Sequence, residues 1–211
     1  MPHVPKTDTY FIENISFETA LEAAMLPSAE YDVSKWLFVP NIYTEYRYIL
    51  GTRGSRPLIC IGVNPSTAAP DRLDPTMQSV QRIALQNGYD SFVMCNVYAQ
   101  RATSPKDMDR KCNGKLHQEN LRAFMCALSL YDKPSIWAAW GNIIETRSYL
   151  SDCLRDMVDI SLARNAAWYH CGAISRKGHP HHPLYLRKGE PLMPFDIQRY
   201  LSIITGRDKR P

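Results

Sequence analysis

Four short apolar runs alternate with helical patterns through the middle of the chain. The runs are Leu58–Val63, Ser91–Val97, Ser135–Trp140 and Ala166–Cys171. Runs of this length with few polar positions are expected of strands that are buried on both faces of a sheet. Because a helical pattern separates each run from the next, the sequence predicts an α/β fold with a mainly parallel, four-stranded central sheet.

Apolar residues at helical spacing fill the segments between these runs. Asp74-Pro75 supplies an N-cap followed by a proline in the first turn, and Gly88 ends the same helix. Pro194–Ile204 predicts a final helix that ends at Gly206. The stripes of the three internal helices are Met77, Val80 and Ala84; Leu116, Leu121, Phe124 and Leu128; and Ile143, Leu150, Leu154 and Met157.

The part of the chain before the first apolar run has weaker patterns. Ser16 is a candidate N-cap for a short helix that extends to Met25. Alternation over Tyr43–Leu50 predicts a strand with Tyr46, Tyr48 and Leu50 on one face, and Gly51–Pro57 predicts a loop. We therefore divide the chain into an acidic N-terminal segment, residues 1–42, packed on or capping the fold, and a single α/β domain, residues 43–211.

Composition excludes several classes of protein. The chain has 211 residues, of which 45% are hydrophobic and 22% charged, as in ordinary globular domains and unlike disordered or collagenous chains. No apolar run approaches the roughly 18 residues that a membrane helix needs, and Met1–Tyr10 lacks the apolar core of a signal peptide. The six scattered cysteines contain no CxxC pair, so we expect reduced thiols and a cytoplasmic location.

The net charge of +4 is unevenly distributed. Residues 1–100 carry 7 Lys and Arg against 10 Asp and Glu, a net charge of −3, whereas residues 101–211 carry 18 against 11, a net charge of +7. A basic second half is compatible with a phosphate-bearing partner such as DNA, and equally with an ordinary solvated surface.

Polar residues stand where the predicted strands end, which is where open parallel sheets bind ligands. Asn64-Pro65 follows the first run, and this pair is either a ligand-facing amide or a simple Asn-Pro turn. Asn96 interrupts the second run, and its buried amide requires both a donor and an acceptor, from a pyrimidine edge or from backbone. Trp140-Gly141 permits a sharp turn after the third run.

The segment Arg176–Lys188, RKGHPHHPLYLRK, contains four basic residues, three histidines and no acid. Its histidines suggest a zinc site, although two prolines stiffen the run and no cysteine accompanies them. The basic flanks around the apolar tip Leu184-Tyr185-Leu186 favour a loop that holds DNA phosphates and carries an apolar wedge.

Taken together, these segments resemble the uracil-DNA glycosylase superfamily. Leu58–Pro65, with Gly62-Val63-Asn64-Pro65, is similar to the GINPG segment of the mismatch-specific branch, and Asn96 to the superfamily's base-reading Asn. Trp140-Gly141 resembles its WG turn, and His182-Pro183-Leu184 its HPSPL loop. From about Tyr46 to Leu186, the chain also resembles an uncharacterised family catalogued as domain of unknown function 1643.

The glycosylase resemblance implies a three-layer α/β/α sandwich and a monofunctional DNA N-glycosylase that flips a base and hydrolyses its glycosidic bond. It implies Asn64 and His182 as catalytic residues, with His179 as the alternative histidine. The implied base-binding residues are Asn96, Val63, Tyr98 and Ser66. The implied DNA-binding residues are Arg101, Arg176, Lys177, His179, Leu184, Tyr185, Arg187 and Lys188.

Two departures from the family pattern bear on the substrate. Ser66 replaces a glycine, and no aromatic residue follows in Ser66–Thr76, so Tyr98 or a tyrosine of Tyr43–Tyr48 would have to stack on the base. The small residues Ser66–Ala69 suggest a roomier pocket and hence a bulky modified pyrimidine, such as glucosylated hydroxymethylcytosine in phage DNA, whose excision would be antiviral.

The expected partner is double-stranded DNA with a flipped base, or single-stranded DNA. We expect a monomer with no membrane contact, no organic cofactor and no metal. The alternatives are a base- or nucleotide-modifying enzyme, and a non-catalytic reader of modified bases on the same fold.

Overall fold

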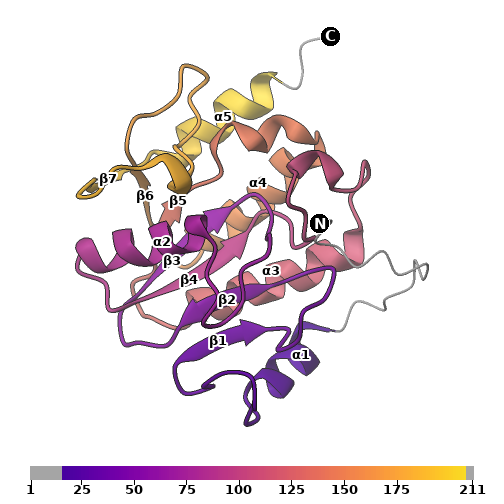
Figure 1. Ribbon diagram of the computed structural model, residues 1–211. Helices are drawn as coiled ribbons and strands as arrows, with labels where there is room; N and C mark the ends of the chain where they lie inside the picture. The colour runs from indigo at the N-terminus through magenta and orange to yellow at the C-terminus, as the bar shows by residue number, and fades with distance from the viewer. Residues whose placement is uncertain (1–15, 208–211) are drawn as a thin grey trace.

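The computed structural model describes residues 16–207, which form a seven-stranded sheet with helices on both faces (Figure 1). The strand order is β1-β2-β4-β3-β5-β6-β7. The central strands are β3 (Pro57–Gly62), β4 (Ser91–Asn96), β5 (Ser135–Ala138) and β6 (Ala167–Cys171). All pairings among these four strands are parallel, which confirms the predicted parallel centre.

The predicted count of four strands is wrong, because three antiparallel strands extend the sheet. They are β1 (Trp36–Val39), β2 (Ile49–Thr52) and β7 (Leu192–Pro194). β2 overlaps the predicted strand Tyr43–Leu50 only at the last two residues of that range and extends into the predicted loop, whereas β1 and β7, with four and three residues, are too short for a periodic pattern to be recognised in the sequence. The residue at position 51, inside β2, has to be a glycine, because a Cβ there would lie 2.3 Å from the carbonyl oxygen of Phe92 on β4.

All five predicted helices are present, although Ile143 lies before the helix to which the sequence assigns it. They are α1 (Phe17–Ala24), α2 (Pro75–Gln86), α3 (Gly114–Leu128), α4 (Tyr149–Leu162) and α5 (Ile197–Arg207). Ser16 and Asp74 are the N-caps of α1 and α2, as predicted. The last helix begins after β7 rather than at Pro194, and Gly206 lies within it.

Two apolar clusters hold helices against opposite faces of the sheet. The first contains buried residues of α1, α3, α4 and α5, whereas the second contains those of α2. Tyr46 and Tyr48 belong to the first cluster and Leu50 to the second, so the predicted common face of these three residues is wrong. The chain bends at Tyr48 and β2 begins only at Ile49, which breaks the alternation.

Residues 16–42 contribute to this sheet and core, while residues 1–15 lie outside the described part of the chain. The β1 strand forms one edge of the sheet, and the Phe17 ring of α1 lies 6.0 Å from that of Tyr48, edge to face. The backbone N–H of Phe17 donates to Oε2 of buried Glu119 on α3 at 2.7 Å. The two parts of the proposed division are therefore joined by strand pairing as well as by packing.

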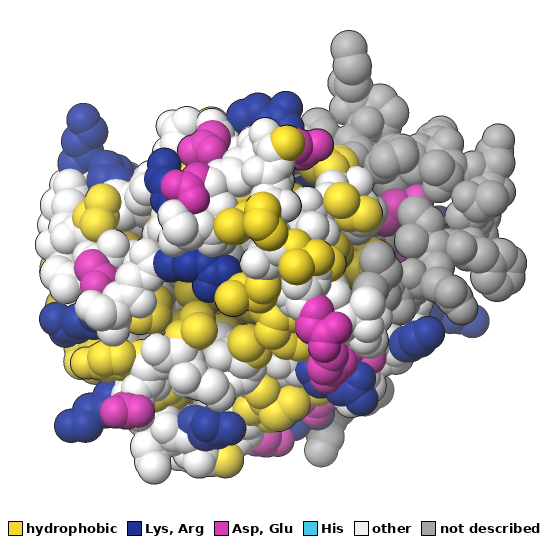
Figure 2. Space-filling view, turned by 90° about the horizontal axis from the view of Figure 1, so that it is seen from below, with side chains coloured by type: hydrophobic (Ala, Val, Ile, Leu, Met, Phe, Trp, Pro, Cys, Tyr) yellow, Lys and Arg dark blue, Asp and Glu magenta, His cyan; other side chains and the backbone are white. Residues whose placement is uncertain are grey.

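The face beneath α1 and β1 is mixed in character. Figure 2 shows hydrophobic side chains gathered between scattered charged ones on this face. Met25 and Leu26, which follow α1, and Ile42, which follows β1, are each more than half exposed. Among residues 16–207, no helix has the length and apolar character needed to span a bilayer.

Candidate functional site

The loops that leave β3, β4 and β5 bring the predicted site residues to one edge of the sheet. Gly62 and Asn96 are register partners at the carboxyl ends of β3 and β4, and Asn64 follows two residues after Gly62. Gly141 begins the short helix η2 (Gly141–Thr146) that follows β5. Since parallel strands end at a common edge, this placement follows directly from the topology.

Asn96 is the most unusual polar residue of this edge. It is 0% exposed, and neither Oδ1 nor Nδ2 of its amide has a hydrogen-bond partner among the described residues. The amide lies on the α2 side of the sheet, where a Cβ added to Gly62 would come within 3.2 Å of its Oδ1. Burying an amide without partners costs about 1–3 kcal/mol, so such groups are rare in folded proteins.

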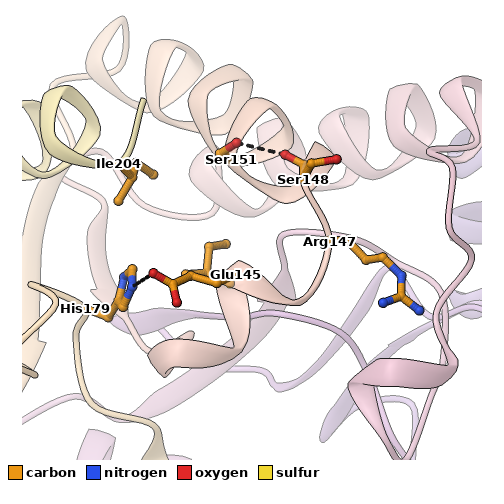
Figure 3. Close-up of a pocket in the computed structure, with 7 residues that line it drawn as sticks. Glu145, Arg147, Ser148, Ser151, His179 and Ile204 are labelled. Carbon is orange, nitrogen blue, oxygen red and sulfur yellow. Dashed lines mark hydrogen bonds and ion pairs between the residues drawn. The ribbon is translucent and has the colours of Figure 1, made fainter. Parts of the chain in front are cut away.

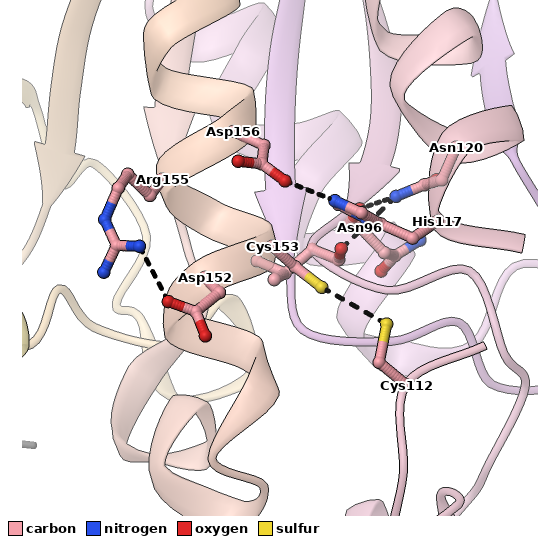
Figure 4. A network of polar contacts seen from close by, with 9 residues as sticks. Asn96, Cys112, His117, Asn120, Asp152, Cys153, Arg155 and Asp156 are labelled. Carbon is pink, nitrogen blue, oxygen red and sulfur yellow. Dashed lines mark hydrogen bonds and ion pairs between the residues drawn. The ribbon is translucent and has the colours of Figure 1, made fainter. Parts of the chain in front are cut away.

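The neighbouring Asn120 of α3 shows the opposite situation. Its Nδ2 donates to the carbonyl oxygens of Asn96 at 2.8 Å and Val97 at 3.3 Å (Figure 4). The backbone at the end of β4 is thus fixed from the α3 side, while the Asn96 side chain on the other side is left without a partner among the described residues.

The side chain of Asn64 is oriented by two hydrogen bonds from its amide nitrogen to backbone carbonyl oxygens. Its Nδ2 donates to the carbonyl oxygens of Ala102 at 2.7 Å and Pro65 at 3.0 Å. Its Oδ1 accepts no hydrogen bond from residues 16–207, and the side chain is only partly buried. An oriented amide oxygen with no protein donor can accept a hydrogen bond from a water molecule.

His182 lies beside the turn after β5. A Cβ on Gly141, which has a φ of 60°, would lie 3.2 Å from Cβ of His182. The His182 Nδ1 atom accepts a hydrogen bond from the backbone N–H of Leu184 at 3.3 Å, as N-cap of the short helix η3 (Pro183–Tyr185). Burial and the nearby His181 lower the pKa of His182, while Asp74 acts in the opposite direction. A neutral ring with an accepting Nδ1 carries its proton on Nε2, which is then a donor.

The histidine loop is fastened to α2. Ser79 Oγ donates to the carbonyl oxygen of Pro183 at 2.8 Å. Arg82 donates to the carbonyl oxygens of Leu186 at 3.4 Å and Arg187 at 3.3 Å. These bonds fix the backbone that carries His182 relative to the sheet.

His179 occupies a different environment from His182. It is 1% exposed, with Nδ1 2.8 Å from Oη of Tyr200 and Nε2 3.0 Å from Oε1 of Glu145. Glu145 also pairs with Lys177, and together these two partners hold the pKa of the Glu145 carboxyl below its usual value. This network lies on η2 and α5 rather than at the Asn64 loop.

The His179 network borders a cavity of about 260 Å³ (Figure 3). The cavity lies between η2, the start of α4 and α5. Its lining residues are Ile144, Glu145, Arg147, Ser148, Ser151, His179 and Ile204. None of the predicted catalytic or base-binding residues other than the alternative histidine lines it.

Two arginines lie buried behind the Ser66–Ala68 loop. Arg47 is 2% exposed and Arg101 is 1% exposed. Arg47 Nη1 donates to the carbonyl oxygen of Ala68 at 3.0 Å, and Arg101 Nη1 donates to the carbonyls of Ser66 and Ala68. The predicted role of Arg101 as a surface contact for DNA does not fit this position, because its guanidinium is covered by the Tyr43 ring at 4.1 Å.

Two predicted base-binding residues lie in the core instead. Val63 and Tyr98 belong to the apolar cluster on the α3 side. The Tyr98 ring is 0% exposed, and its Oη accepts a hydrogen bond from the backbone N–H of Asn113 at 2.8 Å. The chain leaves the strand after Asn96, so Tyr98 does not continue the face of the Asn96 side chain, and its buried ring cannot stack on a base.

Of the other predicted DNA-binding residues, His179 is buried and its predicted surface role is wrong, whereas the rest lie at the surface. Leu184 is 42% exposed and Tyr185 is 74% exposed at the tip of η3. The exposed basic residues around them are Arg176, Lys177, Arg187 and Lys188. This segment therefore has the composition predicted for a loop that contacts a phosphate backbone.

Arg47 and Asp74 are not among the site residues that the sequence predicts, and Tyr43 is predicted only as one of the tyrosines of Tyr43–Tyr48 that could stack on a base. The sequence pattern indicates Asp74 only as an N-cap, and its Oδ1 does accept from the Met77 N–H at 2.9 Å. Burial lowers the pKa of Arg47, Arg101 and His182, and the charge of Asp74 opposes that lowering in all three, which places Asp74 near them. The signal in the sequence is Arg47 itself, a charged residue between two buried tyrosines.

No group of three or more His, Cys, Asp or Glu side chains within residues 16–207 is arranged to hold a metal ion. His117 and Asp156 form a pair at 2.8 Å, and the Sγ atoms of Cys112 and Cys153 lie 3.9 Å apart (Figure 4). Both contacts join α4 to α3 or the loop before it.

Comparisons with known proteins assign a family and nothing finer. A sequence model of the family described as "Protein of unknown function (DUF1643)" matches residues 47–184. No curated protein and no solved structure matches the chain. The matched range includes Asn64, Asn96, Arg47, Arg101 and His182.

Proposed function

Because the chain belongs to the DUF1643 family, whose description names no activity, we propose a function from its site: a monofunctional DNA N-glycosylase that excises a modified pyrimidine. The observation that carries the proposal is the buried amide of Asn96, whose donor and acceptor both lack partners among the described residues. A pyrimidine edge presents an adjacent acceptor and donor, so a flipped base would satisfy both atoms. This proposal includes a glycosylase-like three-layer fold.

His182 is suited to stabilise the leaving base. As the glycosidic bond between C1′ of the sugar and N1 of the pyrimidine breaks, the bonding electron pair moves to the base. Negative charge then develops on the oxygen of the base. The Nε2–H of His182 would donate a hydrogen bond to that oxygen. Because Nδ1 accepts a hydrogen bond from the Leu184 N–H, a neutral His182 ring carries its proton on Nε2. Of the two candidate histidines, His182 is favoured because both ring nitrogens of His179 already have partners.

Asn64 would position the attacking water. An amide is not a strong base, but its oriented Oδ1 can accept a hydrogen bond from water as the oxygen adds to C1′. The sugar has oxocarbenium character at that point, so a positioned neutral water is a sufficient nucleophile. The water proton passes to solvent, and the departing base is protonated in turn.

The surface loop would supply DNA binding. Arg176, Lys177, Arg187 and Lys188 would hold phosphates, and Leu184 or Tyr185 would fill the space left by the flipped nucleotide. Ala68 and Ala69 are buried, but the partly buried Ser66 and Thr67 stand where the glycosylase pattern has its aromatic-containing loop. Their smaller side chains support a bulky substrate such as a glucosylated hydroxymethylpyrimidine, whose removal would act against phage DNA.

A panel of duplexes tests the proposal. Each duplex carries one uracil, hydroxymethylated or glucosylated pyrimidine, and abasic sites are detected as alkali-labile breaks. We expect cleavage of at least one modified duplex, and a loss of about 10²–10³ in rate for His182→Ala, the usual effect of removing one such donor. Asn64→Ala should also lose activity, whereas Arg164→Met at the opposite edge of the sheet should not.

Two results would contradict the proposal. Folded protein that cleaves no member of the panel but binds modified duplexes is a reader of modified bases. Folded protein that ignores DNA and turns over a free nucleotide is a nucleotide-modifying enzyme.

A further inference from the structure

Arg47 and Arg101 form a pair of adjacent buried cations. Arg47 lies between β1 and β2, and Arg101 follows β4, so they come from different parts of the chain. Both donate to the carbonyl oxygen of Ala68, which places the two guanidiniums beside each other. Like charges at this separation repel, and the proximity of Arg101 contributes to lowering the pKa of Arg47.

The pair is not neutralised by the part of the protein that the structure describes. Among residues 16–207, no carboxylate oxygen lies within 4.0 Å of either guanidinium, and Asp74 acts only from a longer distance. Burial lowers the pKa of Arg47 to about 9 and that of Arg101 to about 10, so both remain charged at pH 7. Buried charges without a counter-ion are costly, and proteins usually pair them.

The pair also has unused hydrogen-bond donors. Nε of Arg47, and Nε and Nη2 of Arg101, are buried without a hydrogen-bond partner among the described residues. The donors used so far go to backbone carbonyls of the Ser66–Ala68 loop. Three buried N–H groups of the two guanidiniums are therefore left for a ligand, while the Tyr43 hydroxyl is a side-chain neighbour of Arg101 that opposes the lowering of its pKa by burial.

We propose that Arg47 and Arg101 bind a phosphate group of the substrate. A phosphate offers several oxygens and one to two negative charges, which match two planar guanidiniums better than a single carboxylate does. Tyr43, which is 43% exposed, covers Arg101, so its ring is the side chain that would have to move for an anion to reach the pair. If the phosphate belongs to DNA, this proposal rests on the function proposed above; if it belongs to a free nucleotide, it does not.

The position of the pair relates it to the proposed excision site. Asn64 donates to the carbonyl oxygen of Ala102, the residue after Arg101. Asp74, which is electrostatically coupled to both arginines, is also coupled to His182. A phosphate held here lies next to the proposed reacting nucleotide, either as a DNA phosphodiester or as the phosphate of a free nucleotide.

Thermal unfolding of the full chain with inorganic phosphate tests the proposal. Sodium chloride at equal ionic strength is the reference, because it reproduces general charge screening. We expect Tm to rise by about 5 °C or more at about 100 times the Kd for phosphate. Arg47→Met and Arg101→Met should lose this response, whereas Arg164→Met, on an exposed position at the opposite edge, should keep it.

If the Met variants do not fold, Arg101→Lys provides the test. This variant retains the positive charge but lacks the planar set of N–H donors of a guanidinium. Calorimetric titration should show phosphate affinity reduced by about 10-fold or more, the size expected from removing one charge-assisted hydrogen bond. A wild-type protein that responds to phosphate no more than to chloride, or a response that survives removal of either arginine, overturns the proposal.

Competition identifies the source of the phosphate. Displacement of inorganic phosphate by a pyrimidine nucleoside monophosphate alone assigns a free nucleotide, and displacement by a short duplex assigns DNA. Because phosphate binding is measured without base release, it can succeed where base excision fails, and the two proposals are tested separately.

Discussion

Asn96 and Asn120 are buried asparagines in contact with the same turn of backbone, but only one has a satisfied side chain. The amide of Asn120 donates to two carbonyl oxygens, whereas the amide of Asn96 has no partner among the described residues. The sequence predicts that Asn96 is buried and that its amide needs a partner. It does not predict that the described protein leaves this amide unsatisfied, because backbone carbonyls within reach depend on tertiary packing.

The two asparagines should respond oppositely to the same substitution. Asn120→Ala removes satisfied hydrogen bonds and should lower the free energy of unfolding by about 1–3 kcal/mol. Asn96→Ala removes an amide that is buried at a cost and without a partner among the described residues, so stability should be unchanged or raised by up to about 1 kcal/mol. Urea unfolding of both variants makes the comparison, and an equal loss for the two would mean that Asn96 has a partner in the free protein.

At the scale of elements, the parallel strands and the capped helices were predictable and the edges were not. β3 to β6 are apolar runs with clear boundaries, and Asp74-Pro75 is a strong start signal for α2. β1, β2 and β7 are short segments whose position depends on pairing with a neighbouring strand, and a short segment does not encode such pairing by its own pattern. The same applies to Arg47, whose burial beside Arg101 depends on where β1 and β2 turn.

The short helix η3 gives the proposed reaction a pH dependence. His182 caps η3 only when Nδ1 is unprotonated, and burial places its pKa below the ordinary value of about 6.5. The neutral, capped form is therefore complete above about pH 6.5 and is lost as the pH falls through the lowered pKa. Excision should be constant well above the ordinary histidine pKa of about 6.5 and should fall only at a more acidic pH than that at which an unperturbed imidazole titrates.

His182→Gln separates this titration from other effects of acid. A glutamine amide can donate to the base without titrating, so the variant should be slower than wild type but should lose the acid limb of the profile. Rates measured from about pH 5 to about pH 8 with this variant make the test. An acid limb that persists in His182→Gln assigns the titration to another group.

At the scale of the whole molecule, the position of the positive charges matters more for the proposed phosphate binding than the net charge of +4. The exposed basic residues of 176–188 lie on one loop, whereas Arg47 and Arg101 come from other parts of the chain and are buried. Uneven charge between the two halves is visible in the sequence. Which of these positive charges lie on a surface loop and which are buried is seen only in the fold, since the sequence does not distinguish Arg101 from a surface cation.

The salt dependence of DNA binding should report the surface loop. Removing one phosphate interaction reduces the slope of log K against log salt by about 0.9. Arg187→Gln with Lys188→Gln should therefore lower the slope by about 2. The matched control, Lys133→Gln with Arg164→Gln, removes the same charge from the opposite edge and should leave the slope nearly unchanged. Equal effects of the two pairs would place DNA elsewhere on the molecule.

The central claim is that Asn96 reads a base which the protein then releases. The most direct measurement is the amount of free base that appears, by mass spectrometry, when wild type and Asn96→Ala act on the duplexes containing modified pyrimidines. We predict release by wild type, loss of release in Asn96→Ala with its fold intact, and normal release by Arg164→Met. Equal release by wild type and Asn96→Ala, or no base released from any duplex by folded wild type, would contradict the account.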